Sequence, residues 1–386
     1  MKLSVKQFNS INQFDQKSWD ALNINKNPFL NYHFLNALES SASVSAETGW
    51  EIAHLGWFDQ EGILQAAMPQ YYKTHSYGEY MFDWAWAEGI TKAGIPYYPK
   101  VVSAIPFTPV SGQRFMLSEE LDLAQPNLRV ELLSQHLTDI NSGRPTDHQL
   151  SNFQCLFITE DDTENWRNAG AMIRQGYQFS WYNHDYKCFD DFLADLRSSP
   201  RKKIKKERRS LLATDITFKR LENTEIDDEL WEFFIVCYQQ TYLKRSGHTG
   251  YLNHEFFNKL RDTMAENLLI ICAYRNEQPL ACSLFIKGNN TLYGRYWGAV
   301  ELVDSMHFEC CYYQAIEYCI EQGIECFQPG TQGDYKRRRG FIPEPVFGAY
   351  YFADVNLQQP IQEYLDQETK QLEHQFTHWK QTTPYK

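Results

Sequence analysis

Hydrophobic and polar positions follow strand or helix periodicity in two successive halves of the chain. The first half predicts a helix, two strands joined by a turn, a third strand, a helix and a strand, at 27–43, 50–58, 63–73, 78–87, 128–141 and 153–159. The second half predicts two helices, three strands, a helix and two strands, at 227–245, 253–267, 268–275, 279–288, 291–299, 305–323, 324–328 and 345–354. Because strands followed by a crossing helix and another strand form a mixed sheet, this shared order predicts a duplicated α/β unit.

Local signals refine several of these elements. Asn27 followed by Pro28 is typical of a helix start, and Ser305 is expected to cap the helix that follows it. That helix carries an apolar stripe formed by Phe308, Cys311, Tyr312, Ala315, Ile316, Cys319 and Ile320. Between the two halves, 196–214 predicts a basic helix.

Composition limits the class of protein. A chain of 386 residues is long enough for two or three domains of about 150 residues each. The net charge of -12 argues against a bulk nucleic-acid coat. The N-terminus has no apolar signal core, and no apolar run approaches the ~20 residues that span a bilayer. We therefore expect a soluble, cytoplasmic protein without a membrane span, whose oligomeric state the sequence leaves open.

The nine cysteines indicate a reduced protein. They show no C-x-x-C spacing, and four of them lie in apolar, helix- or strand-like sequence: Cys310, Cys311, Cys319 and Cys326. We expect these four to pack in a core and to bind no metal.

The first candidate site lies on the predicted strand 78–87. Alternation puts four rings on one face: Tyr80, Phe82, Trp84 and Trp86. Asp83 falls on the other face among small apolar side chains, where an unpaired charge is costly. We expect Asp83 to be a catalytic base, a partner for a positive substrate group, or half of an ion pair with a cation of the next strand. The rings form either a core or a substrate platform.

Two basic features are further candidates. The proline-rich segment 96–114 is bracketed by Lys100 and Arg114 and is either a carboxylate or phosphate site or a rigid loop. In the basic helix, seven of the nine residues from Arg201 to Arg209 are basic. Such a helix is either a solvated surface or a phosphate-binding element, for which we single out Arg201, Lys202 and Lys205.

The second half contains the remaining candidates. Arg295 lies in the middle of a predicted strand, where a buried arginine needs a carboxylate or a ligand. His307 and Glu309 begin the next helix, but the downstream P-C-x-x-C of zinc deaminases is absent. The loop 330–341 contains Gly330 and Gly333, which allow a close approach of the backbone to a ligand. It lacks the GK[ST] ending of a Walker loop.

Many separate segments resemble the bacterial FemAB-like family of predicted N-acyltransferases in the GNAT superfamily. The resemblance rests on "NPFLNYHFLNALES", "HSYGEYMFDWAWA", "PYYPK", "PFTPV", "LYGRYWG", "HFECCYYQAIE" and "QGDYKRRRGF". It implies an α/β fold of two tandem GNAT-like domains with mixed sheets. We expect the first domain at 1–165, completed by 355–386, and the second at 166–354, opened by the basic helix at 200–213.

The resemblance implies transfer of an acyl or aminoacyl group to an amine of a small molecule, a peptide or a cell-wall (peptidoglycan) precursor. The donor would be acyl-CoA or aminoacyl-tRNA, with no tightly bound cofactor and no metal. GNAT domains usually hold the CoA pyrophosphate in a glycine-rich loop before the central helix. Here the corresponding segment carries Glu301 and Asp304 and lacks glycine after Gly298, which argues against a standard CoA site.

The resemblance places Gly333, Tyr335 and Lys336 near the acyl-transfer centre. Our hypothesis is that Lys336 and Arg295 stabilise the oxyanion and that Asp83, His307 or Glu309 is the base. The expected substrate-binding residues are Tyr80, Trp84, Trp86, Lys100, Arg114, Tyr296, Gln332, Gly333 and Arg339. Arg339 is also expected to assist the basic helix in holding phosphates. The alternative is a non-catalytic GNAT-like module that binds a peptide, a glycan or a phosphorylated ligand.

Overall fold

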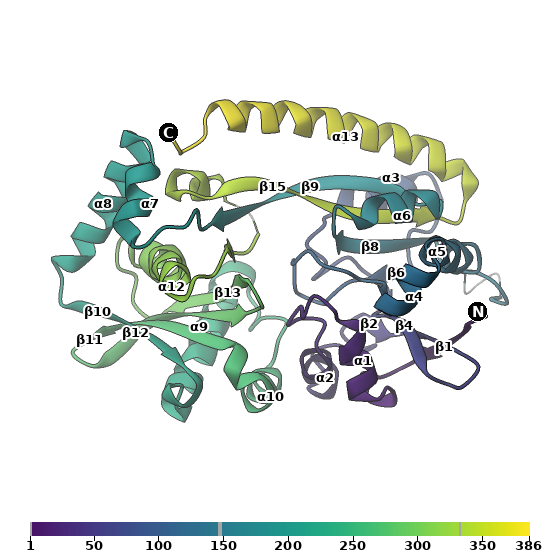
Figure 1. Cartoon of the computed structure of the whole chain (residues 1–386), viewed down its shortest axis with the longest axis horizontal. Helices are drawn as coiled ribbons and strands as arrows, with labels where there is room; N and C mark the ends of the chain where they lie inside the picture. Colours follow the sequence, from purple (N-terminus) through teal and green to yellow (C-terminus); the bar gives the residue numbers. More distant parts are fainter. Residues whose placement is uncertain (1, 146–148, 332) are drawn as a thin grey trace. The chain divides into compact units, whose positions relative to one another are not determined.

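The computed structural model describes residues 2–145, 149–331 and 333–386, and the chain divides into two compact units. Unit 1 comprises Met1–Tyr177 and Pro345–Gln375, and unit 2 comprises Gln178–Glu344 and Phe376–Lys386 (Figure 1). The chain therefore passes between the units three times, inside β9 (Met172–Tyr182), β15 (Ile342–Phe352) and α13 (Val355–Gln381). The unit boundaries therefore differ from the expected domain boundaries at 165/166 and 354/355. β9, β15 and α13 each supply residues to both units, and no change of composition marks the points where the units meet in the sequence.

Unit 1 contains two sets of paired strands. The first set, in the order β1-β3-β4-β7, is antiparallel: β1 (Ser4–Phe8), β3 (His54–Phe58), β4 (Leu64–Met68) and β7 (Met116–Leu117). The second set contains β15, β8 (Asn152–Ile158), β6 (Lys100–Ser103), β5 (Tyr71–Lys73) and β2 (Trp50–Ile52). In this second set β6 and β8 pair in parallel and the other pairs are antiparallel, so the sheet is mixed.

Apart from α13, whose residues up to Gln375 belong to unit 1, the helices of this unit are short. They are α1 (Gln16–Leu22), α2 (Tyr32–Ser40), α3 (Trp84–Lys92), α4 (Glu119–Ala124), α5 (Leu128–Thr138) and α6 (Asp162–Asn168). Buried residues of α5 and α6 form one apolar core with β3, β4, β6 and β8.

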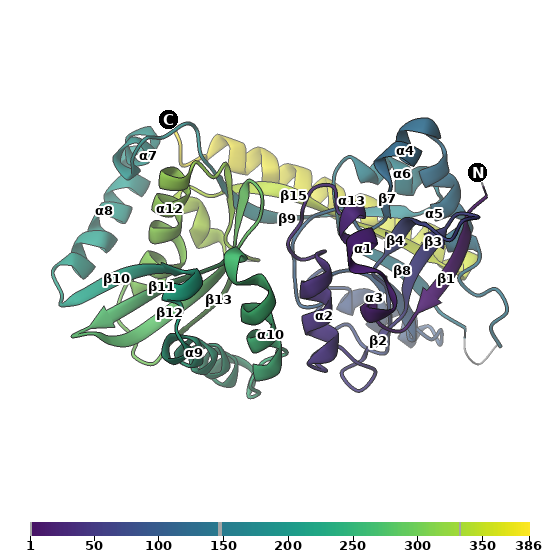
Figure 2. The same cartoon turned by 60° about the horizontal axis from the view of Figure 1, so that its bottom comes forward.

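Unit 2 repeats the mixed arrangement. Its strands follow the order β10 (Ile216–Glu222), β11 (Leu268–Arg275), β12 (Gln278–Lys287), β13 (Thr291–Ala299), β14 (Cys326–Gln328) and β9. β13 and β14 pair in parallel, and the other pairs are antiparallel. The helices are α7 (Phe189–Asp195), α8 (Ser198–Leu212), α9 (Asp228–Ser246), α10 (His254–Met264), α11 (Met306–Phe308) and α12 (Gln314–Gln322). α9 and α12 lie against opposite faces of this sheet (Figures 1 and 2).

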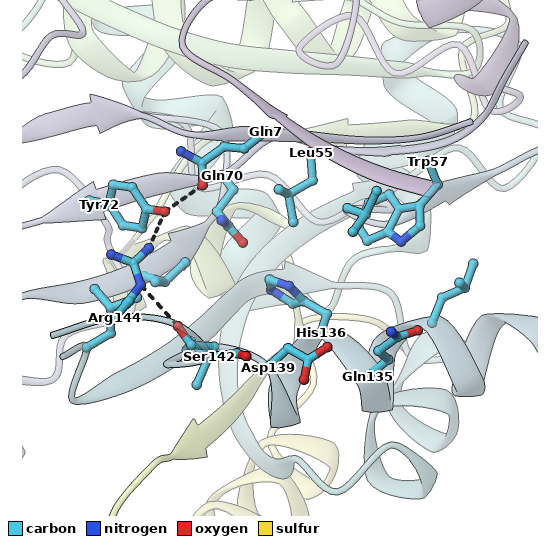
Figure 3. A pocket seen from close by; sticks show the side chains of 15 residues that line it. Gln7, Leu55, Trp57, Gln70, Tyr72, Gln135, His136, Asp139, Ser142 and Arg144 are labelled. Atoms are coloured by element: carbon cyan, nitrogen blue, oxygen red, sulfur yellow. Dashed lines mark hydrogen bonds between the residues drawn. The ribbon is translucent and has the colours of Figure 1, made fainter. Parts of the chain in front are cut away.

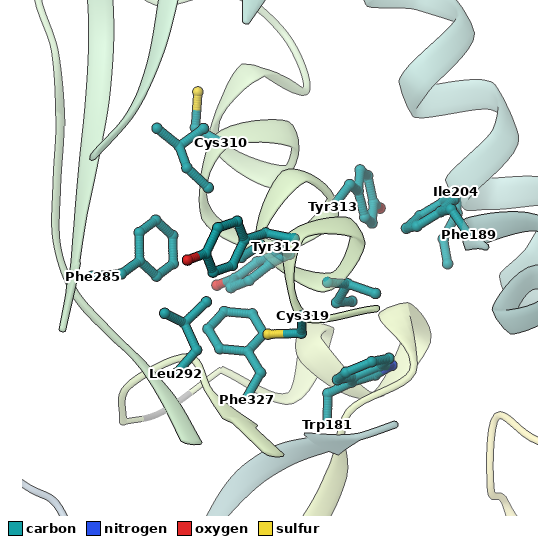
Figure 4. Packing of buried hydrophobic residues seen from close by; sticks show 14 of the residues in the cluster. Trp181, Phe189, Ile204, Phe285, Leu292, Cys310, Tyr312, Tyr313, Cys319 and Phe327 are labelled. Carbon is teal, nitrogen blue, oxygen red and sulfur yellow. The ribbon is translucent and has the colours of Figure 1, made fainter. Parts of the chain in front are cut away.

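The predicted apolar stripe of 305–323 is confirmed. Its residues pack into the core of unit 2 against strands β12, β13 and β14, and Figure 4 shows Tyr312 and Cys319 among Phe285, Leu292 and Phe327. Cys310 and Cys319 are fully buried there, while Cys311 and Cys326 are half-buried. The structure thus places Cys310, Cys311 and Cys319 in or against the core of unit 2, as expected, and Cys326 on β14.

Several predictions in the first half are wrong. The segment 78–87 is no strand: Gly78 and Tyr80 have φ of 82° and 63°, which interrupt extension, and α3 begins at Trp84 with Asp83 as N-cap. The helix predicted over 27–43 begins only at Tyr32.

The two strands predicted at 50–58 and 63–73 are each divided, because their two ends pair in different sheets. The described residues contain no helix that combines the length and the apolar character needed to cross a membrane.

Candidate functional site

The centre of unit 2 is the strand β13, which is irregular where Arg295 lies. The register with β12 moves from Leu284↔Tyr296 to Phe285↔Gly294, so Arg295 is an extra, bulged residue. The parallel pairing with β14 covers only 291–293 of β13. β-Bulges are frequent beside active sites because they redirect side chains. The sequence thus places Arg295 where β13 both bulges and separates from β14.

Lys336 lies in a tight turn, η6 (Asp334–Arg339), that follows β14. Gly333 and Gly340 flank the turn with φ of 99° and 89°, a region that glycine adopts without strain. The Lys336 side chain is 2% exposed, and its Nζ donates to the carbonyls of Gly330 at 2.7 Å and Thr331 at 3.1 Å. Gln332, another predicted site residue, lies outside the described residues.

The loop that leads into the Lys336 turn is in direct contact with β13. A Cβ at Gly294 would lie 3.2 Å from the Cα of Pro329, a tight distance, so glycine favours this close approach of β13 to the start of the loop. Gly330, the next residue of the loop, accepts the hydrogen bond from Lys336. Lys336 is therefore attached to the loop immediately beside the bulge of β13.

Burial perturbs the charge of Lys336. It lowers the pKa of the amine to about 7, and Cys311 opposes this shift. Among the described residues no carboxylate forms an ion pair with Lys336, and its Nζ donates to backbone carbonyls. An ammonium group in such a position can hold an anion or an oxyanion.

His307 lies at the beginning of the helix that follows β13. Its ring contacts Trp297 of β13 at 5.3 Å and Tyr312 at 5.4 Å between centroids. Burial, together with the charges of Arg245, Arg339 and Lys336, lowers the pKa of His307 to about 4. His307 is therefore neutral at pH 7 and lies within electrostatic reach of Lys336. Neither Arg245 nor Trp297 was expected here, because α9 and β13 are brought to His307 only by the tertiary fold.

Glu309 is turned toward a different neighbour. The helix has a π-helical turn, η5 (Glu309–Tyr313), a feature that is often found at functional sites. Glu309 Oε1 accepts from Arg208 of α8 at 2.9 Å and from Gln314 at 2.7 Å. Burial raises the pKa of Glu309, and Arg208 opposes this shift. Glu309 thus belongs to the ion-pair network of α8.

Arg339 is likewise part of this packing. Its guanidinium is 1% exposed, pairs with Glu207 of α8 at 2.7 Å, and lies 3.4 Å from the centroid of the Phe308 ring. A buried arginine with a carboxylate partner and an aromatic neighbour fixes the η6 turn against α8. The structure gives Arg339 a structural role instead of the expected contact with substrate phosphate.

Arg295 and Tyr296 lie together on β13. Arg295 Nη2 donates to the hydroxyl of Tyr296 at 3.2 Å. The ring of Tyr296 packs against Tyr238 and Phe257 at 5.1 and 5.7 Å between centroids. Both side chains remain partly exposed, so they are accessible to a ligand at the bulge.

The basic helix α8 exposes the cations that the sequence singled out. Lys202 and Lys205 are exposed and Arg201 is half-buried. Ile204 and Leu211 anchor the opposite side of the helix in the core of unit 2. This surface can bind phosphate.

Asp83 lies in unit 1, in a buried cluster of charges. Its Oδ2 accepts from Lys100 Nζ at 2.5 Å, Tyr97 at 2.5 Å and Gln154 at 3.0 Å. Burial alone would raise the pKa of Asp83, but the charge and hydrogen bonds of Lys100 outweigh it and the pKa is lowered. Of the three expected roles, the structure shows the ion pair with a cation of a neighbouring strand.

A second carboxylate completes this cluster. Lys100 Nζ also pairs with Glu79 at 2.8 Å, and Lys73 Nζ lies 3.9 Å from the other oxygen of Glu79. Burial raises the pKa of Glu79 and lowers that of Lys73. Lys100 and Asp83 thus hold α3 to β6, and no charge is left for a substrate carboxylate.

The other predicted residues of unit 1 are mostly structural. Arg114 is fully buried and donates to the carbonyls of Leu156 and Gly112, so it shapes the proline-rich loop. Trp86 is buried and contacts the guanidinium of Arg174 at 4.7 Å. Trp84 is 42% exposed, so the rings do not form one platform. Tyr80 occupies the positive-φ turn before α3.

Comparison with known proteins identifies the family. The model of the FemAB-like family, described as peptidoglycan biosynthesis/recognition, matches residues 10–386. The chain belongs to the FemAB-like family. No curated protein has a matching sequence.

Solved structures of similar fold are distant in sequence. FemX matches with a TM-score of 0.54 and 11% identity, over 90% of this chain and 98% of that one. The C-terminal domain of a lysylphosphatidylglycerol synthetase from Agrobacterium fabrum matches with a TM-score of 0.52 and 8% identity, over 88% and 92%. A conserved protein of unknown function from Bacteroides thetaiotaomicron matches with a TM-score of 0.51 and 11% identity, over 90% and 99%. The predicted fold, two tandem GNAT-like domains with mixed sheets, is confirmed.

Proposed function

We propose that this FemAB-like protein is an N-acyltransferase that moves an acyl or aminoacyl group from an activated donor to an amine of a peptidoglycan-type precursor or a peptide. The observation that carries the proposal is Lys336, a buried amine whose pKa of about 7 leaves it partly protonated at pH 7. It has no carboxylate partner among the described residues, and it is held beside the bulge of β13 and within electrostatic reach of His307. Family membership supplies the cell-wall context.

The reaction sets the requirements for the site. The amine nitrogen attacks the donor carbonyl carbon, a C–N bond forms, and the carbonyl oxygen becomes an oxyanion. The bond from carbon to the sulfur or oxygen of the leaving group then breaks, and the amine loses a proton. A preorganised cation at the oxyanion lowers the barrier because it is already desolvated. We assign that role to Lys336, assisted by Arg295.

His307 is our candidate for the proton acceptor. Asp83 and Glu309 are both engaged in short ion pairs inside their units. His307 is neutral at pH 7 and forms no ion pair within the described part of the chain. Its low pKa makes it a weak base, which suits a step in which the proton is lost only after the C–N bond has formed.

For the donor we favour aminoacyl-tRNA over acyl-CoA. The amide nitrogens of Met306, Phe308 and Glu309 donate to Val303 and Ser305 of the preceding loop, so most of the N-terminal N–H groups are already bonded. Glu301 in that loop pairs with Arg275. A CoA pyrophosphate would need those free N–H groups, whereas the exposed lysines of α8 suit a polyphosphate chain.

Mass spectrometry tests this proposal directly. The full chain is incubated with a UDP-linked muropeptide precursor and either charged total tRNA or acetyl-CoA, and the precursor is examined for added aminoacyl or acetyl mass. We expect an aminoacyl increment with tRNA, its loss in Lys336→Met, and its retention in Lys380→Met, a matched change at an exposed lysine of α13. Full activity of Lys336→Met would disprove the assignment. Precursor binding without any mass increment in the native protein would establish the non-catalytic module instead.

A further inference from the structure

Unit 1 contains a pocket that is independent of the site proposed above. Its volume is about 210 Å³, and strands β1, β3, β5 and β6 together with helix α5 surround it. The wall is mostly apolar, with Leu55, Trp57, Val101 and Leu132 among the lining residues. Figure 3 shows this hollow with the side chains that face it.

Among the polar side chains that line this pocket, Gln70 and His136 each carry a buried atom without a hydrogen-bond partner among the described residues. Gln70 is 3% exposed, and its Oε1 has no hydrogen-bond partner among the described residues. The rest of its amide is fixed, because Nε2 donates to the carbonyl of Ala53 at 3.4 Å. His136 Nε2 is also buried without a partner among the residues described. Figure 3 shows Gln70 and His136 pointing toward each other across the pocket.

The ring of His136 is fixed by its neighbours. It packs edge-on against Phe153 at 5.0 Å and Trp57 at 6.5 Å between centroids. Burial lowers the pKa of His136 to about 4, so the ring is neutral at pH 7. The pocket therefore presents a neutral ring nitrogen and an amide oxygen, and neither of them calls for a charged partner.

Buried polar atoms without partners are rare in folded proteins, and each one is costly unless something fills the space. A hydroxyl group satisfies both atoms at once: it donates to Gln70 Oε1 and accepts from the N–H tautomer of His136 Nε2. A sugar would leave hydroxyl groups facing the apolar side chains, because the polar lining residues Gln7, Tyr72 and Arg144 already bond to one another.

The size of the pocket limits its occupant. A protein cavity of about 150 Å³ holds benzene, so the 210 Å³ of this pocket holds a benzene ring with a few additional atoms. Gln7, Gln135 and Asp139 line the same pocket and are exposed, so a molecule can enter from solvent.

We propose that this pocket binds a small uncharged aromatic molecule with a single hydroxyl group, such as a simple phenol. The hydroxyl lies between Gln70 and His136, and the ring packs among Leu55, Trp57 and Leu132. The site does not depend on the proposed acyl transfer, since all of its residues belong to unit 1 and none belongs to the Lys336 site.

The test compares two probes that differ by one hydroxyl group, p-cresol and toluene. Ligand-observed NMR titration of the full chain measures both, because a ligand of this size binds with a Kd of about 1 mM. We expect p-cresol to bind about 5- to 10-fold more tightly than toluene, as two new hydrogen bonds in an apolar site require. Equal binding of the two probes, or no binding of p-cresol, would overturn the proposal.

Variants locate the site. Gln70→Met and His136→Phe keep the volume and each remove one of the two polar atoms. Each is therefore expected to lower the ratio of the two affinities to about 2- to 3-fold, and the double variant to bring it close to unity, while toluene still binds. Gln135→Met changes an exposed lining residue and is expected to preserve the ratio. Retention of the native ratio in both buried variants would place p-cresol elsewhere on the protein and would refute the assignment.

Discussion

The buried amine of Lys336 makes the stability of the protein depend on pH in a defined direction. Burial lowers its pKa from 10.5 to about 7. Between these two values the unfolded chain binds a proton at this position that the folded chain does not bind. Stability therefore rises with pH in this window. Below pH 7 both states are protonated, and the full cost of the buried charge is present.

The magnitude follows from the linkage relation. For one group with these two pKa values, the free energy of unfolding rises by about 2 kcal/mol between pH 7 and pH 9. Lys336→Met has no such group, so the difference in unfolding free energy between native and variant should change by the same amount over this range. The other titrating groups are common to both proteins and cancel in the difference.

Urea denaturation followed by tryptophan fluorescence measures both curves. Native protein, Lys336→Met and the exposed control Lys380→Met are unfolded at several values between about pH 6.5 and 9.5. We expect the control to run parallel to the native protein. Between pH 7 and pH 9 the native protein should gain about 2 kcal/mol of unfolding free energy relative to Lys336→Met. Parallel curves for Lys336→Met would show that the amine keeps its ordinary pKa, and the argument for a desolvated cation at the transfer site would fail.

Three other substitutions test separate features by chemical or thermal denaturation. Lys100→Met leaves the two buried carboxylates of unit 1 without their shared cation and should cost about 3–5 kcal/mol; an unchanged midpoint would contradict the role of this cluster. Gly340→Ala introduces a Cβ 2.7 Å from the ring of Phe192 at a φ of 89°, and should cost about 1–3 kcal/mol; native stability would show that the turn adapts. Glu207→Gln leaves the guanidinium of Arg339 buried without a charged partner and should lower the free energy of unfolding by about 1–3 kcal/mol. Unchanged stability would show that the cation–π contact with Phe308 alone fixes the turn.

The parts of the fold that local pattern determines were predictable from the sequence. β13 has the predicted bounds, and α9 differs by one residue at each end, because periodicity and capping residues define both. The order of elements revealed the duplication for the same reason. The prediction of a strand over 78–87 was wrong, because alternating aromatic residues imitate strand periodicity. The turn at Tyr80 and the N-cap at Asp83 depend on long-range packing, which this local pattern does not reveal.

The site was predictable to a smaller extent. The family resemblance pointed to Lys336 and the residues beside it, and the structure places Lys336 and His307 in one electrostatic neighbourhood. The sequence could not show that Glu309 faces α8. That orientation depends on the π-helical turn and on Arg208, which is about a hundred residues away in the chain. Arg245 left no signal, because a cation in the last turn of a helix is ordinary there.

The three passages of the chain between the units also affect how the protein folds during synthesis. Unit 1 includes Pro345–Gln375, whose strand β15 pairs with β8 and whose helix α13 carries Glu368 to Arg174. At about 5–20 residues per second, a ribosome that has finished Tyr177 needs roughly 10–40 s more to supply that segment. The nascent first unit must remain unfinished for this time, with the edge of β8 exposed, so chaperone capture during translation should be more frequent than for a protein whose domains are sequential.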